Sequence, residues 1–294
     1  MSLNKPIWKL RNWIDIHNLN WSNLSENPNA INLLENNQDK IDWSNLSGNP
    51  NAIDILKKNP DKINWYRLSE NPNAINLLEN NQDKIDWSNL SRNSNAIKIL
   101  HENQDKIDWF MLSTNSDAIS ILENNISKIN WYNLSYNPNA IKLLEENFDR
   151  INWFSFSRNI NGIELLEKNP EKIDWFYLSF NSSAIKLLNA NPEKIDWYGL
   201  SSNSNAIKLL KENKNKINWY SLSLNPNAIE LLKENQDKID WYNFSKNPSI
   251  FELDYETMKN NNEKLYEELI IEVMKPSRVF KNPDYDYLEE LFGY

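Results

Sequence analysis

The 294-residue chain contains no cysteine, which excludes a disulfide framework, a thiolate metal site and a cysteine nucleophile. Its two histidines, His17 and His101, stand far apart in the sequence at positions where we expect surface residues. This disfavours histidine-based catalysis and metal binding. Its 4 glycines form none of the clusters that phosphate-binding loops need. No carboxylate pair is singled out for acid–base work. These absences predict that the chain is not an enzyme and holds no cofactor or metal.

Long apolar runs and a basic stripe are also missing. No apolar run approaches the roughly 20 residues of a membrane span, and the N-terminus lacks the apolar core of a signal peptide. We therefore expect no membrane partner, no secretion and a cytoplasmic location. The net charge is -9, to which residues 251–294, with 11 acids and 5 bases, contribute -6. Because phosphate attraction drives nucleic-acid affinity, this charge argues against nucleic acid as a partner.

Tryptophan recurs at a fixed interval of 22 residues through most of the chain. The series is Trp21, Trp43, Trp65, Trp87, Trp109, Trp131, Trp153, Trp175, Trp197, Trp219 and Trp241. When each unit is counted from its tryptophan, position four is Leu or Phe, position five is Ser and position seven is Asn. Most units continue with Ala-Ile-x-Leu/Ile-Leu. This period predicts a solenoid, since one short unit cannot bury its apolar face without stacked neighbours.

Two helices are predicted in each unit. Asp42, directly before a tryptophan, is a suitable N-cap for a short first helix. Asn49-Pro50 indicates the N-cap and first position of a longer second helix, and Asn59 would end that helix in the left-handed C-cap conformation. The repeated Ser and Asn should form ladders that satisfy backbone groups between units. A strand at Lys-Ile-Asp-Trp, as in a leucine-rich horseshoe, is the alternative, but its alternation covers only two apolar residues.

The predicted fold is an all-α solenoid of eleven helix-turn-helix repeats, wound as a right-handed superhelix. With helices about 8–10 Å apart, it would be a curved rod on the order of 100 Å long. The expected domains are an amphipathic, helical N-terminal cap at 1–19, the repeats at 20–250 and an acidic helical C-terminal cap or tail at 251–294. In that last segment we expect one amphipathic helix over Asn262–Met274 and a short helix from Tyr285 to Phe292.

The consensus Ile-Asp-Trp-x-x-Leu-Ser-x-Asn-Pro-Asn-Ala-Ile resembles the short repeat abundant in proteins of giant, amoeba-infecting viruses of the mimivirus type. The resemblance covers residues 20–250, and the segments Lys9–Ile14 and Met274–Arg278 also look like the ends of that family. It implies a viral repeat protein, a helical solenoid in the host cytoplasm or viral factory, without an assigned activity. It carries over no functional residue.

The candidate binding residues are those that vary between repeats. The residue after each tryptophan is Ser in units one, two and four, and is aromatic from unit five onward. The position between the repeated Ser and Asn also varies widely, which suggests exposure. The predicted partner-binding stripe is Phe110, Tyr132, Phe154, Phe176, Tyr198, Tyr220 and Tyr242, with Tyr136, Phe180 and Leu224 from the second position. These rings could either form a binding strip or fill the groove between repeats.

The predicted function is a noncatalytic scaffold that presents an extended surface to a protein partner, host or viral. Two alternatives stay open. One is a helical repeat protein that reads nucleic acid one base per repeat, and the other is a structural or virion component that stacks end to end. The sequence identifies neither the partner nor the oligomeric state.

Overall fold

The computed structural model describes residues 6–273. The chain divides into two compact units, one from Leu10 to Phe251 and a smaller one formed by the chain on either side of it. The larger unit contains the repeats and is an all-α solenoid, as predicted, in which short α-helices alternate with 3-10 helices.

Each repeat begins with a short α-helix at its tryptophan. The predicted N-cap is confirmed: the Asp42 carboxylate accepts a hydrogen bond from the Asn45 amide at 3.0 Å. The Asn64 side chain accepts from the Arg67 amide at the same distance in the next repeat. These first helices are α1 (Trp21–Glu26), α3 (Trp43–Gly48), α5 (Trp65–Ser69), α7 (Trp87–Arg92), α9 (Trp109–Leu112), α11 (Trp131–Tyr136), α13 (Trp153–Phe156), α15 (Trp175–Ser179), α17 (Trp197–Ser202), α19 (Trp219–Leu222) and α21 (Trp241–Phe244).

The second α-helix begins later than the Asn-Pro pair indicated. Asn49 accepts a hydrogen bond from the Asn51 amide, two residues on, which makes a tight turn rather than an α-helical cap. The α-helix then starts at the isoleucine. These second helices are α2 (Ile31–Glu35), α4 (Ile53–Lys58), α6 (Ile75–Glu79), α8 (Ile97–Glu102), α10 (Ile119–Glu123), α12 (Ile141–Glu146), α14 (Ile163–Lys168), α16 (Ile185–Ala190), α18 (Ile207–Glu212) and α20 (Ile229–Lys233). In several repeats the turn is itself a 3-10 helix: η4 (Pro72–Ala74), η6 (Ser94–Ala96), η9 (Pro138–Ala140), η12 (Ser182–Ala184), η15 (Pro226–Ala228) and η17 (Pro248–Ile250).

A further 3-10 helix, which the sequence analysis did not predict, closes the repeats. The left-handed cap proposed for Asn59 is wrong, because its φ is -131° and its ψ is 60°. The side-chain amide of Asn59 instead donates to the Ile55 carbonyl at 3.0 Å. It thus satisfies a carbonyl at the C-terminal end of the helix without a residue in the left-handed conformation. The closing helices are η2 (Gln38–Lys40), η3 (Pro60–Lys62), η5 (Gln82–Lys84), η7 (Gln104–Lys106), η8 (Ile126–Lys128), η10 (Phe148–Arg150), η11 (Pro170–Lys172), η13 (Pro192–Lys194), η14 (Lys214–Lys216) and η16 (Gln236–Lys238).

The predicted ladders of Ser and Asn join neighbouring repeats. The Ser25 hydroxyl donates to the Trp21 carbonyl at 2.8 Å and accepts from the Asp42 amide of the next repeat at 3.0 Å. The side-chain amide of Asn49 donates to the Ser25 and Asn27 carbonyls of the preceding repeat, both at 3.0 Å. Both side chains are fully buried, so each interface satisfies polar backbone groups that would otherwise be costly to bury.

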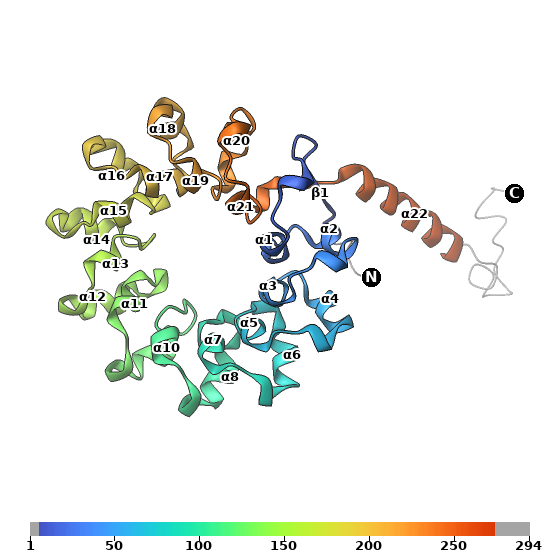
Figure 1. Ribbon diagram of the computed structural model, residues 1–294. Helices are drawn as coiled ribbons and strands as arrows, with labels where there is room; N and C mark the ends of the chain where they lie inside the picture. Colours follow the sequence, from blue (N-terminus) through green and yellow to red (C-terminus); the bar gives the residue numbers. More distant parts are fainter. Residues whose placement is uncertain (1–5, 274–294) are drawn as a thin grey trace, which may run out of the picture. The chain divides into compact units, whose positions relative to one another are not determined.

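The same bonds join the first repeat to the last. The side-chain amide of Asn27 donates to the Ser245 and Asn247 carbonyls at 3.1 and 3.0 Å. The Asn49 side chain makes the same two bonds to repeat one. The backbone amide of Asn20 donates to the Ser245 hydroxyl at 2.8 Å, and the Asn23 side chain donates to the Tyr242 carbonyl at 2.7 Å. We call this contact the seam. Figure 1 shows α1 beside α21 and the larger unit closed into a ring.

Closure corrects one expectation. The predicted curved rod is wrong, because the two ends of the solenoid pair with each other. A full turn shared among eleven repeats requires a rotation of roughly 33° per repeat. The first helices contact one another closely from repeat to repeat, whereas the second helices do not. The first helices therefore form the inner wall of the ring and the second helices its outer wall (Figure 1).

The apolar core lies between these walls. Leu46, Ala52 and Leu56 are fully buried, as are their equivalents in most repeats. Repeat seven has Phe156 and Gly162 where most repeats have Leu and Ala. A Cβ on Gly162 would lie 2.8 Å from the Phe156 ring, so the larger aromatic ring requires the smaller residue.

The described residues before the first repeat, 6–20, form no α-helix, although a helical cap was expected there. They form strand β1 (Trp8–Leu10) and 3-10 helix η1 (Ile16–Asn18). The Trp13 ring lies 5.9 Å from the Phe244 ring, and the Arg11 amide donates to the Ile250 carbonyl at 3.0 Å. This segment therefore packs on the last repeat.

Strand β1 pairs with β2 (Phe251–Leu253). In the smaller unit the Asp254 amide donates to the Ile7 carbonyl at 2.8 Å, and helix α22 (Tyr255–Val273) follows. A helix was predicted here over 262–274, and it begins earlier, next to the Asp254 cap. The short helix predicted for 285–292 lies outside the described residues.

Candidate binding surface

The predicted stripe lies on the exposed side of the inner helices. The seven stripe rings that directly follow a tryptophan are all exposed, between 43% for Tyr198 and 58% for Tyr242. From the second variable position, Tyr136 and Leu224 are exposed and Phe180 is half-buried. These rings do not fill the groove between repeats, which was the alternative left open. We call this set of ten residues the aromatic belt.

Rings of the belt contact one another across repeat boundaries. Phe176 lies 5.4 Å from Phe180 within repeat eight, and Phe180 lies 5.9 Å from Tyr198 in repeat nine. Tyr177, which the sequence analysis did not single out, lies 4.0 Å from Phe154 and 5.1 Å from Phe176. The belt is therefore continuous from repeat seven to repeat nine, in the edge-on and tilted geometries that aromatic pairs prefer.

Tyr177 belongs to a third variable position, two residues after the tryptophan. This position carries Asn in many repeats, but Arg67 in repeat three, Met111 in repeat five and Gly199 in repeat nine. The same comparison of repeats that identified the other two positions could have found it. Tyr177 faces the same surface as the belt, because its ring meets Phe154 of the preceding repeat.

The inner wall of repeats one to four carries charged side chains beside the exposed ring of Tyr66, and the charges continue across the seam to repeat eleven. Arg67 donates to Glu26, two repeats away, at 2.9 Å, and also to Glu70. Lys246 lies 3.3 Å from Glu26 across the seam, and Arg92 lies 3.9 Å from Glu70. We call these five residues the ionic cluster. Because Gly48 has no side chain, the Arg67 guanidinium can pass over repeat two, where a Cβ would lie 3.3 Å from it.

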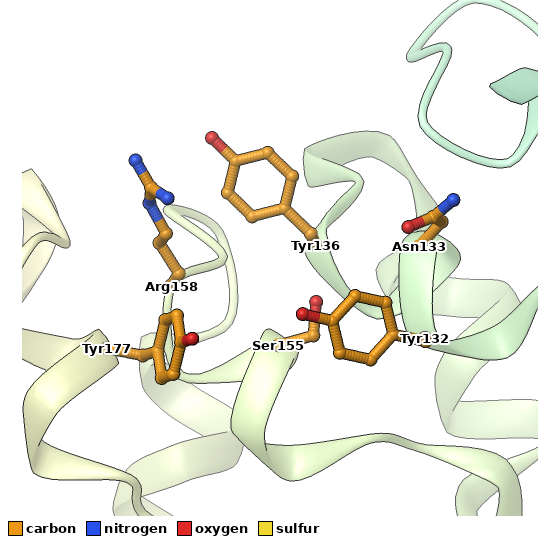
Figure 2. Close-up of a pocket in the computed structure, with 6 residues that line it drawn as sticks. All are labelled: Tyr132, Asn133, Tyr136, Ser155, Arg158 and Tyr177. Atoms are coloured by element: carbon orange, nitrogen blue, oxygen red, sulfur yellow. The ribbon is translucent and has the colours of Figure 1, made fainter.

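A small hollow lies within the belt at repeats six to eight. Its lining comes from three consecutive inner helices, and its volume is about 150 Å³. Figure 2 shows Tyr132 and Tyr177 pointing toward each other with Ser155 between them. Arg158 and Tyr136 stand on one side of this group (Figure 2). The complete lining is Tyr132, Asn133, Tyr136, Ser155, Arg158 and Tyr177.

The tryptophans have a structural partner of their own. The Lys106 ammonium lies 4.5 Å from the Trp87 ring centre, and most repeats contain the equivalent pair. Such a pair stabilises an exposed site by about 0.5–1 kcal/mol. The repeated lysine is therefore part of the scaffold and contributes little free positive charge to a ligand.

His17 and His101 are both exposed, as expected. Residues 6–273 contain no group of three His, Asp or Glu side chains arranged to hold a metal ion. Within that range no helix has the length and apolar character to cross a bilayer. No family model, curated protein or solved structure matches the chain.

Proposed function

We propose that this chain is a noncatalytic scaffold whose aromatic belt docks a protein partner. One observation carries the proposal: seven successive repeats expose a ring at a position where three other repeats have serine. Serine there is compatible with the repeat, so the scaffold itself does not need the rings. Contiguous exposed apolar surface is typical of interaction sites, and Tyr and Phe supply contact area at little entropic cost.

A viral context is part of the proposal, since the repeat resembles those of giant amoeba-infecting viruses. The partner would then be a host or viral protein met in the host cytoplasm or viral factory. The belt offers such a partner a path of exposed aromatic rings along the inner helices.

The stacked rings and Arg158 favour one competing function, the binding of single-stranded nucleic acid, because bases stack on aromatic side chains. The charge along the belt weighs against it. Asp108, Asp174, Asp196 and Asp240 cap inner helices that carry belt rings, and phosphates would meet their carboxylates. End-to-end self-assembly loses its main support, since the seam occupies both ends of the solenoid.

The test uses a belt variant that copies the serine of the other repeats. It combines F110S, Y132S, F154S, F176S and Y198S. A control variant, F148Q with I160S, removes two exposed apolar residues outside the belt and also uses residues found in other repeats. We expect host-cell extract to yield a partner with the wild type and the control but not with the belt variant. Equal recovery by all three folded proteins would contradict the proposal.

A further inference from the structure

The hollow at repeats six to eight combines a cation with aromatic walls. The Arg158 guanidinium lies 5.5 Å from the Tyr136 ring centre and 5.0 Å from the Phe180 ring centre. It is thus held between rings of the preceding and following repeats. Contact with two rings restrains the guanidinium, and its exposed N–H groups stay available to a ligand.

Arg158 differs from the other bases at the variable positions of the inner wall. Arg67, Arg92 and Lys246 all pair with Glu26 or Glu70 in the ionic cluster. In the described part of the chain no carboxylate pairs with Arg158, and its side chain is exposed. Its positive charge is therefore uncompensated by a neighbouring acid.

The rest of the lining supplies hydrogen-bond donors without a negative charge. The hydroxyls of Tyr132, Ser155 and Tyr177 form no hydrogen bond within residues 6–273. Two of the three helices that form the hollow are capped by neutral Asn130 and Asn152 rather than by Asp. An anion placed here would meet one cation and several hydroxyl donors, with no carboxylate in the lining.

The volume selects the size of the ligand. A space of about 150 Å³ is comparable to a cavity that binds one benzene ring, whereas pockets for drug-sized molecules enclose roughly 300–1,000 Å³. One amino-acid side chain fits this space. The flanking rings Phe154, Phe176 and Phe180 would cover the apolar residues on either side of it.

We propose that this hollow receives an acidic side chain, Asp or Glu, from an extended segment of the protein partner, with apolar neighbours on the belt. This inference rests on the proposed function and adds the chemistry that would be recognised. A carboxylate is favoured over a nucleic-acid phosphate because a single charge suits the hollow. A continuous row of phosphates would run past the carboxylates of Asp174 and Asp196.

The experiment selects ligands from a displayed library of random twelve-residue peptides on the immobilised full-length chain. We expect enriched peptides that contain Asp or Glu beside an aromatic or aliphatic residue. Each selected peptide is then compared with its Asn or Gln version. Because exposed ion pairs are weaker than buried ones, we expect a loss of about fivefold in affinity for the neutral peptide.

Three variants assign that loss to the hollow. R158Q should remove the preference for the acidic peptide, and R158K should retain part of it because the charge stays. R92Q changes an inner-wall arginine of the ionic cluster and should leave the preference unchanged. A fluorescent oligothymidylate provides the nucleic-acid comparison.

Each outcome decides the inference. Acid preference that is lost in R158Q and kept in R92Q supports it. Peptides that bind through the belt with no acid preference, or with one that R158Q does not alter, overturn the inference but leave the proposed function intact. Selected peptides that bind the five-serine belt variant as tightly as the wild type overturn both. Oligothymidylate that competes with the peptides and depends on Arg158 would overturn the carboxylate assignment.

Discussion

Substitution of the ladder asparagine at the seam tests whether the solenoid is closed. Asn137, in the middle of the chain, donates to the Ser113 and Asn115 carbonyls at 3.3 and 3.0 Å and accepts from the Asn139 amide at 3.0 Å. Asn27 makes the three equivalent bonds, but two of them cross to repeat eleven. The variants N27A and N137A therefore remove the same interactions at two different interfaces.

The expected cost follows from counting the bonds. A hydrogen bond contributes a net of about 1 kcal/mol to stability, so removing three should cost about 3 kcal/mol. In the closed ring, N27A and N137A should lower the free energy of unfolding by similar amounts. In an open rod, Asn27 would keep only its bond to the Asn29 amide, and N27A would cost only about 1 kcal/mol.

Urea unfolding followed by tryptophan fluorescence measures the two costs, and amide hydrogen exchange locates them. In the wild type, the Ala30 amide of repeat one should be as protected as the Ala140 amide of repeat six, since both bond to a ladder asparagine carbonyl. Rapid exchange at Ala30, together with a cost of N27A well below that of N137A, would refute closure.

Three further predictions concern the repeats and the smaller unit. S157A should destabilise the chain by about 1–3 kcal/mol in urea unfolding, because it leaves the buried-interface amide of Asp174, now bonded at 2.9 Å, without a partner; a cost near zero would contradict the Ser ladder. G162A should cost about 1–3 kcal/mol by overpacking against Phe156, and F156L in the same chain should restore most of it by recreating the Leu–Ala pair of other repeats; additive costs would contradict this coupling. The Thr257 hydroxyl and amide and nearby Lys9 hold the pKa of Asp254 below its ordinary value of 3.8. Because that pKa is depressed in the folded state, its stabilising contribution is present above pH 3.8 and fades as the pH falls further. T257V should raise the Asp254 pKa in a carbon-detected NMR titration, and an unchanged pKa would show that the hydroxyl is not the main cause.

Features that depend on contacts within one repeat, or between a repeat and its neighbour, could be predicted from the sequence. The cap at Asp42 and the ladders of Ser25 and Asn27 were predicted because each uses a short, recurring spacing. The second helix was predicted with its start too early, since Asn49 has two possible partners along the backbone and bonds to the nearer one. The C-cap at Asn59 was wrong because the side-chain amide offers an alternative to the left-handed backbone.

The candidate site was predicted in part. Variation between repeats identified the belt residues, but burial decides whether a variable aromatic is a core residue or a binding residue, and only the structure gives it. The hollow could not be predicted in this way, because Tyr132, Ser155 and Tyr177 come from three repeats and two different repeat positions. Their proximity depends on the twist of the inner wall, which no local pattern specifies.

The sequence by itself determined the repeat length, the helical class and the polar residues that join one repeat to the next. The tertiary structure decided that the eleven repeats form a ring. Closure depends on the rotation at each interface, and every packed side chain contributes a small amount to that rotation. A difference of a few degrees per repeat, summed around the ring, separates a closed seam from an open superhelix, so this property belongs to the whole solenoid rather than to any single motif.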